Sequence, residues 1–112
     1  DAETTEQIRE MMFTFEDLSR IDSRGLQKIL SSIDVRQLAT SLKGADQSLQ
    51  DQILGNVSKR VRESVVDEKE FLGPLPIAEV QEARREVTRI ARSLIEGGEI
   101  SLPRGNVDQL VN

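Results

Sequence analysis

The sequence predicts an all-α protein, a compact bundle of about six helices. Apolar residues recur at intervals of three and four residues along most of the 112-residue chain, and no useful length of it alternates apolar with polar residues. Aspartate or serine precedes several of these apolar stretches, in the position of a helix N-cap. Glycine and proline separate the last two long stretches, which indicates short turns between packed helices.

The first helices are expected to be short. Residues 1–11 have the pattern of the end of a helix, and residues 15–21 that of a short helix or turn. Gly44 suits a left-handed cap at the end of a later helix. Three stretches begin with an aspartate as N-cap, namely Asp22, Asp34 and Asp46.

A longer helix is predicted from SKRVRESVVDEKEF, residues 58–71, with Ser58 as its N-cap. The segment GPLP at 73–76 ends it, and a second long helix is expected at residues 77–96, before two glycines. One face of the first long helix is apolar, at about 100 degrees per residue, and is expected to be buried against the second long helix. The residues of this face are Val57, Val61, Val65 and Leu72.

The order of charges in residues 58–71 is unfavourable for a helix. Cations crowd its start and acids crowd its end, where the helix dipole disfavours each sign. Each misplaced charge costs about 0.3–1 kcal/mol at an exposed helix end, so stability alone does not account for the order. The residues concerned are Lys59, Arg60 and Arg62 at the start, and Asp67, Glu68 and Glu70 at the end.

Composition argues against several functions. The chain has no cysteine and no histidine, so the usual nucleophiles, general bases and transition-metal ligands are missing, and neither an enzyme nor a metal or other cofactor is expected. A formal net charge of -5 and the lack of Trp and Tyr argue against nucleic acid as a partner. No apolar run reaches the roughly 20 residues of a membrane-spanning helix, so direct membrane insertion is not expected.

Six short segments resemble, in order and spacing, segments of the FliG family of flagellar motor switch proteins. They are MFTFEDL at 12–18, LATSLKGAD at 38–46, NVSKR at 56–60, EFLGP at 70–74, EVQEARREV at 79–87 and GGEI at 97–100. The resemblance is to the C-terminal part of that family and implies an armadillo-like, superhelical fold. It divides the chain into the end of a preceding helix at 1–11, a hinge motif at 12–15, a helical torque domain at 16–100 and a flexible tail at 101–112.

The resemblance implies a rotor and switch component of the bacterial flagellar motor, at the cytoplasmic face of the inner membrane in the basal body. The expected partners are the cytoplasmic loop of a MotA-type stator protein, neighbouring FliG copies, and FliM in the switch ring. The charges associated with torque in the family correspond here to Lys43, Arg60, Asp67 and Glu68. The hinge, about which the later helices would reorient during switching, corresponds to Met12, Phe13, Thr14 and Phe15. Pro76 stands where many family members have an arginine, so one expected cation is missing.

Plainer interpretations of these residues remain open. Lys43 suits the C-terminal end of its own helix, where the dipole favours a cation, and Asp67 and Glu68 suit a solvated surface. On pattern alone, the segment MMFTFEDL at 11–18 is more typical of an ordinary core than of a hinge. The alternative function is a generic all-helical scaffold or adaptor that binds another protein.

Overall fold

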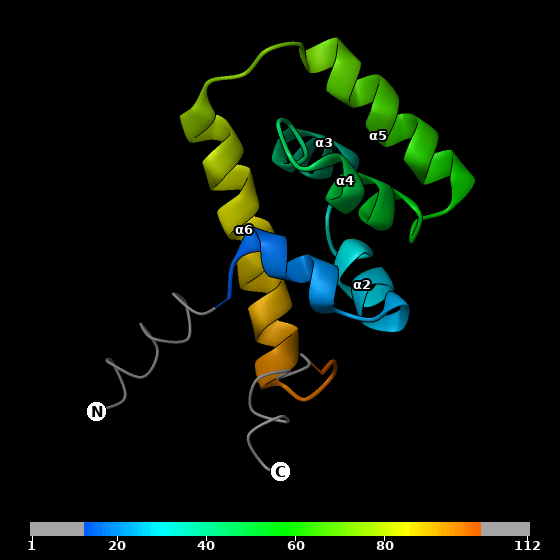
Figure 1. Ribbon diagram of the computed structural model, residues 1–112, viewed down its shortest axis with the longest axis vertical. Coiled ribbons are helices and arrows are strands. Elements are labelled where there is room, and N and C mark those ends of the chain that lie inside the picture. The colour runs from blue at the N-terminus through cyan, green and yellow to red at the C-terminus, as the bar shows by residue number, and fades with distance from the viewer. Residues whose placement is uncertain (1–12, 102–112) are drawn as a thin grey trace.

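The computed structural model describes residues 13–101, so the expectations for residues 1–12, Met12 of the hinge included, and for the tail from residue 102 lie outside the described residues. The described part consists of six helical elements and contains no strand (Figure 1). They are the 3-10 helix η1 (Phe15–Arg20) and the α-helices α2 (Ser23–Leu30), α3 (Val35–Ser41), α4 (Gln47–Leu54), α5 (Lys59–Leu72) and α6 (Ile77–Glu96). The all-α prediction is therefore confirmed. No helix of this part is long and apolar enough to cross a bilayer.

Side-chain caps explain where three of these helices begin. The Asp22 and Asp34 carboxylates each accept a hydrogen bond from the amide three residues further on, at 2.8 and 2.7 Å. The Ser58 hydroxyl does the same for α5 at 3.1 Å. Asp46 occupies the N-cap position of α4, as expected, but its side chain makes no capping hydrogen bond. Each of the three bonds satisfies an amide that has no partner within its own helix.

Glycine follows the ends of two of these helices. Gly44 follows the last turn of α3 with a φ of 73°, the left-handed conformation expected of it. Gly73 follows α5 with φ 61° and ψ -158°, a combination that only glycine adopts readily. The chain then passes through two prolines into α6, and these residues fix the turn between the two long helices.

The short helix α3 lies at the centre of the packing. It packs against α5 on one side and α6 on the other, while η1 packs against α4 and α6, and α2 packs against α6 (Figure 1). The largest fully buried side chains come from every element, which makes one continuous core; they are Leu18, Leu26, Ile29, Leu42, Ile53, Val65, Val87 and Ser41.

The structure corrects the expected packing of α5. This helix packs on α3 and not on α6, because α3 lies between the two long helices and packs against both. Val65 is the buried residue of α5, and Val57 and Leu72 are partly buried against the core. Val61, which was expected in the core, lies one turn before Val65 and is 36% exposed.

Candidate interaction surface

The side of α5 that faces away from the core carries charges of both signs. At about 100 degrees per residue, Arg60, Asp67 and Phe71 fall on one stripe turned away from Val65. All three are exposed, and Phe71 is 82% exposed. Arg60 and Asp67 lie about 10 Å apart along the axis, given the rise of an α-helix. These three residues, Arg60, Asp67 and Phe71, are called the outer stripe of α5 below.

The charges of the outer stripe have no partner among the described residues. Neither the Arg60 nor the Asp67 side chain forms a hydrogen bond or ion pair there, and the Glu63 side chain, between them, forms none either. Glu63 and Asp67 are four residues apart on the same helix and carry the same sign, which is mildly destabilising. Glu68 is half-buried and lies at the edge of the apolar face of α5.

The exposed charges of α6 are arranged in the opposite way. Glu82 accepts a hydrogen bond from Arg85 at 2.6 Å, and Glu86 accepts two from Arg89, one turn further along. These pairs neutralise the surface of α6 within the helix itself. In the same molecule, therefore, one long helix pairs its surface charges and the other leaves them available to a partner.

Two other basic residues of α5 serve the fold. Arg62 donates from Nε to the Leu54 carbonyl at 3.1 Å, and so satisfies a carbonyl in the last turn of α4. Lys69 donates from Nζ to Gln50 Oε1 at 2.6 Å. Gln50 in turn donates to the Ala45 carbonyl at 2.8 Å. Arg62 thus has a structural reason for its position near the start of the helix, whereas Arg60 has none.

Lys43 also makes a structural contact. Its ammonium donates to the Lys69 carbonyl at 2.6 Å, in the last turn of α5, and the side chain is half-buried. The contact is with the C-terminal end of a neighbouring helix, which attracts a cation for the reason expected of Lys43's own helix. Since Lys69 and Arg60 are nine residues apart, Lys43 and Arg60 lie near opposite ends of α5 and form no single cluster.

The described residues of the hinge motif lie at the start of η1. Phe13 and Phe15 are buried, at 7% and 5% exposure, and belong to the core, while Thr14 is exposed. The Thr14 amide donates to Asp17 Oδ2 at 2.8 Å, which fixes the first turn of η1. In this conformation the two phenylalanines are ordinary core residues, and a hinge role for them stays a prediction.

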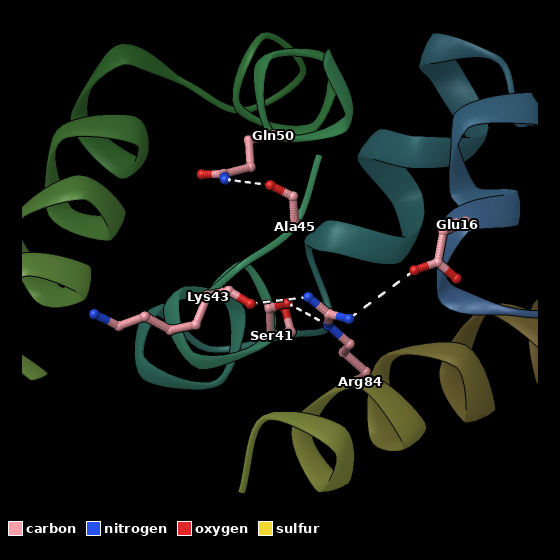
Figure 2. A network of polar contacts seen from close by, with 6 residues as sticks. All are labelled: Glu16, Ser41, Lys43, Ala45, Gln50 and Arg84. Carbon is pink, nitrogen blue, oxygen red and sulfur yellow. Dashed lines mark hydrogen bonds and ion pairs between the residues drawn. The ribbon is translucent and has the colours of Figure 1, made fainter. Parts of the chain in front are cut away.

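Arg84 of α6, which the sequence did not mark as a candidate, makes several polar contacts with the end of α3 and with η1 (Figure 2). From α6 it donates through Nε to the Ser41 carbonyl and through Nη2 to the Lys43 carbonyl, both at 2.9 Å. Its Cζ lies 4.9 Å from the centroid of the Phe15 ring, and Nη1 is 4.0 Å from Glu16 Oε2. Contacts between a side chain and distant carbonyls leave no sequence pattern, so only the structure reveals them.

Comparisons with known proteins agree on one family. Residues 1–102 match the FliG C-terminal domain. The flagellar motor switch protein FliG of Thermotoga maritima is 40% identical over 109 residues, covering 97% of this chain and 32% of the relative. FliG of Vibrio cholerae is 38% identical over 105 residues, covering 94% of this chain and 30% of the relative. The chain thus spans about a third of the length of these relatives.

Solved structures give the same result for the fold. A crystal structure of Helicobacter pylori FliG, residues 116–343, aligns with a TM-score of 0.84 at 38% identity, covering 90% of this chain and 44% of that one. Full-length FliG from Aquifex aeolicus aligns with a TM-score of 0.78 at 38% identity, covering 83% of this chain and 29% of that one.

Proposed function

The chain belongs to the FliG C-terminal domain family, and from that premise we propose that it is the torque-transmitting part of a rotor and switch component of the bacterial flagellar motor. The supporting relatives are named flagellar motor switch proteins. The observation that carries the proposal is the outer stripe of α5, where Arg60 and Asp67 are exposed and have no partner among the described residues. A role as a structural motor component, and not as an enzyme, accords with this surface.

The partner that this surface fits best is the cytoplasmic loop of a MotA-type stator protein with charges of both signs. At physiological salt, charges are screened over roughly 8 Å, so two charges about 10 Å apart act as two nearly separate contacts. A loop that offers an acid to Arg60 and a base to Asp67 is therefore aligned along α5 in one direction. Such contacts speed and orient the encounter more than they tighten binding, which suits a contact that must form and break repeatedly.

The remaining predicted residues fit the proposal in different ways. Glu68 lies beside Asp67 and can add to its negative field. Lys43 reaches a stator loop only by releasing the Lys69 carbonyl, so its contribution requires a local rearrangement. Phe13, Thr14 and Phe15, with Met12 outside the described residues, are proposed as the joint about which this domain reorients when rotation changes direction.

The proposed setting is the switch ring at the cytoplasmic face of the inner membrane, in the flagellar basal body. There, neighbouring FliG copies and FliM are the further proposed partners. A generic helical scaffold with another partner is the competing function. Deletion of the gene distinguishes the two, because loss of a rotor component abolishes swimming, and loss of an unrelated adaptor does not.

Reversal of one charge tests the mechanism. Arg60→Asp in the full-length protein places a favourable anion in the first turn of α5, so the domain should be as stable as the parent or more stable by roughly a few tenths of a kcal/mol. Torque of tethered cells should nonetheless fall. The fall should deepen when Lys43 is also neutralised, and reversing the partner acid on the stator loop should partly restore torque.

A matched control is available on another helix. Arg24 is an exposed second residue of α2, as Arg60 is of α5, so Arg24→Asp makes the same change of charge in the same helical position. It should leave torque unchanged. Normal torque in the Lys43 and Arg60 double variant would refute the charge mechanism. Torque lost in proportion to stability would make Arg60 structural.

A further inference from the structure

Arg84 joins three segments that are distant in sequence. Figure 2 shows its guanidinium pointing from α6 towards the end of α3 on one side and η1 on the other. The side chain is only 23% exposed. It therefore lies between the hinge motif and the turn at 42–45 that carries Lys43, and it touches both.

One planar group makes both kinds of contact. The edge of the guanidinium donates to the carbonyls of Ser41 and Lys43, at the end of α3, where carbonyls lack intrahelical partners. Its Cζ lies over the Phe15 ring, within the range of a cation–π contact. Because the group is rigid and planar, its position against the ring and the aim of its two donors are linked.

The turn held by Arg84 continues to α5. Lys43, whose carbonyl Arg84 binds, donates its ammonium to the Lys69 carbonyl of α5. Ala45, in the same turn, accepts from Gln50, which binds the Lys69 ammonium. α5 has a single fully buried side chain, so these polar links are a large part of what fixes its orientation.

We propose that Arg84 is a positioning residue that couples the hinge motif to the orientation of α5. A rearrangement of Phe15 would release the guanidinium face, weaken its hold on the turn at 42–45, and let α5 and its outer stripe shift relative to α6. The meaning of this shift for the motor rests on the proposed function; the coupling itself is a property of the fold. The alternative is that Arg84 merely caps α3 and contributes to stability alone.

Distance measurement on the full-length protein tests the coupling. These 112 residues contain no cysteine. With any cysteine elsewhere in the full-length protein replaced, spin labels on cysteines introduced at Ser64 of α5 and Ser93 of α6, both exposed, report how these helices lie. Arg84→Gln removes the cation and the two-carbonyl fork, and Phe15→Leu removes the ring but keeps an apolar side chain. Each should shift or broaden the label-to-label distance distribution. Combining the two should add little, because both break the same contact.

The control is Arg85→Gln, an adjacent arginine that is 66% exposed and pairs only with Glu82 among the described residues. It should leave the distance distribution unchanged. A parental distribution in Arg84→Gln, even with lowered stability, would overturn the proposal in favour of a simple cap. Additive shifts in the double variant would show that Arg84 and Phe15 act separately, which also overturns it. Neither result depends on a stator, so failure of the motor role would be seen in the Arg60 experiment instead.

Discussion

Replacing Val65 by alanine should loosen α5, because this valine is the only residue of the helix that is fully buried. The change deletes two methyl groups from a side chain with no exposed surface. At about 0.8 kcal/mol per methylene-sized group, the lost burial is about 1.6 kcal/mol. The cavity left between α5 and α3 adds to this, so the expected loss of unfolding free energy is about 1.5–3 kcal/mol.

Chemical denaturation measures this loss directly. The midpoint should fall with the slope unchanged, since the surface exposed on unfolding is nearly the same. Val66→Ala is the matched control, as Val66 adjoins Val65 on α5 and is 45% exposed. It should be near neutral, because the burial it loses is partly offset by the better helix propensity of alanine.

Hydrogen exchange shows where the stability is lost. Since α5 is attached through α3 and few buried groups, the amides of α5 should exchange faster in Val65→Ala, while those of α6 change less. Equal midpoints for the Val65 and Val66 variants would mean that the contact with α3 does not hold α5. In that case α5 is not anchored chiefly at Val65.

Three further changes have expected outcomes. Gly73→Ala should lower stability by about 1–3 kcal/mol in thermal unfolding, since alanine is strained at φ 61° and ψ -158°. Lys43→Met should cost about 1 kcal/mol, because the Lys69 carbonyl loses its donor; an unchanged midpoint would show that the bond is dispensable. The hydrogen bond from Arg89 lowers the pKa of Glu86, so Arg89→Gln should raise that pKa in an NMR titration. The stability gained from this pair is present above the unfolded carboxyl pKa and lost as pH falls through the lowered one, so the two proteins should converge in acid.

The starts and ends of the helices could be predicted because their determinants are local. Asp22, Asp34 and Ser58 cap amides three residues away, and Gly44 and Gly73 adopt backbone conformations that other residues resist. Each signal lies within one turn of the boundary that it sets. Helical periodicity likewise identified the apolar face of α5 that contains Val65.

The partner of that face could not be predicted in the same way. Periodicity shows which side of a helix is apolar but not which helix covers it, and short connections favour but do not require packing between neighbours in sequence. α3 is short, and its sequence did not predict that it would lie between the two long helices. Val61 was placed in the core because it shares the apolar face of α5, and it is 36% exposed.

The residues of the candidate site show the same difference between local and tertiary determinants. The outward position of Arg60 follows from the helical repeat, whereas the contacts of Lys43 and Arg84 follow from the tertiary fold. Both of these residues donate to backbone carbonyls, at separations of 26 and 41 residues. Every residue type has a backbone carbonyl that can accept such a bond. No residue pattern marks a partner of this kind, so a lysine suited to the end of its own helix was found at the end of another.

The order of charges along α5 now has two separate explanations. Arg62 and Lys69 are accounted for by their bonds to α4, and α5 ends at Leu72, so Asp67 lies before the last turn, where the dipole effect has decayed. The dipole argument therefore applies at the start of the helix, to Arg60 above all. Asp67, by contrast, faces Glu63 of the same sign one turn away and lacks the pairing that neutralises charges of α6. Stability favours neither residue where it stands, whereas a partner that approaches along the outer stripe would find one charge of each sign in place.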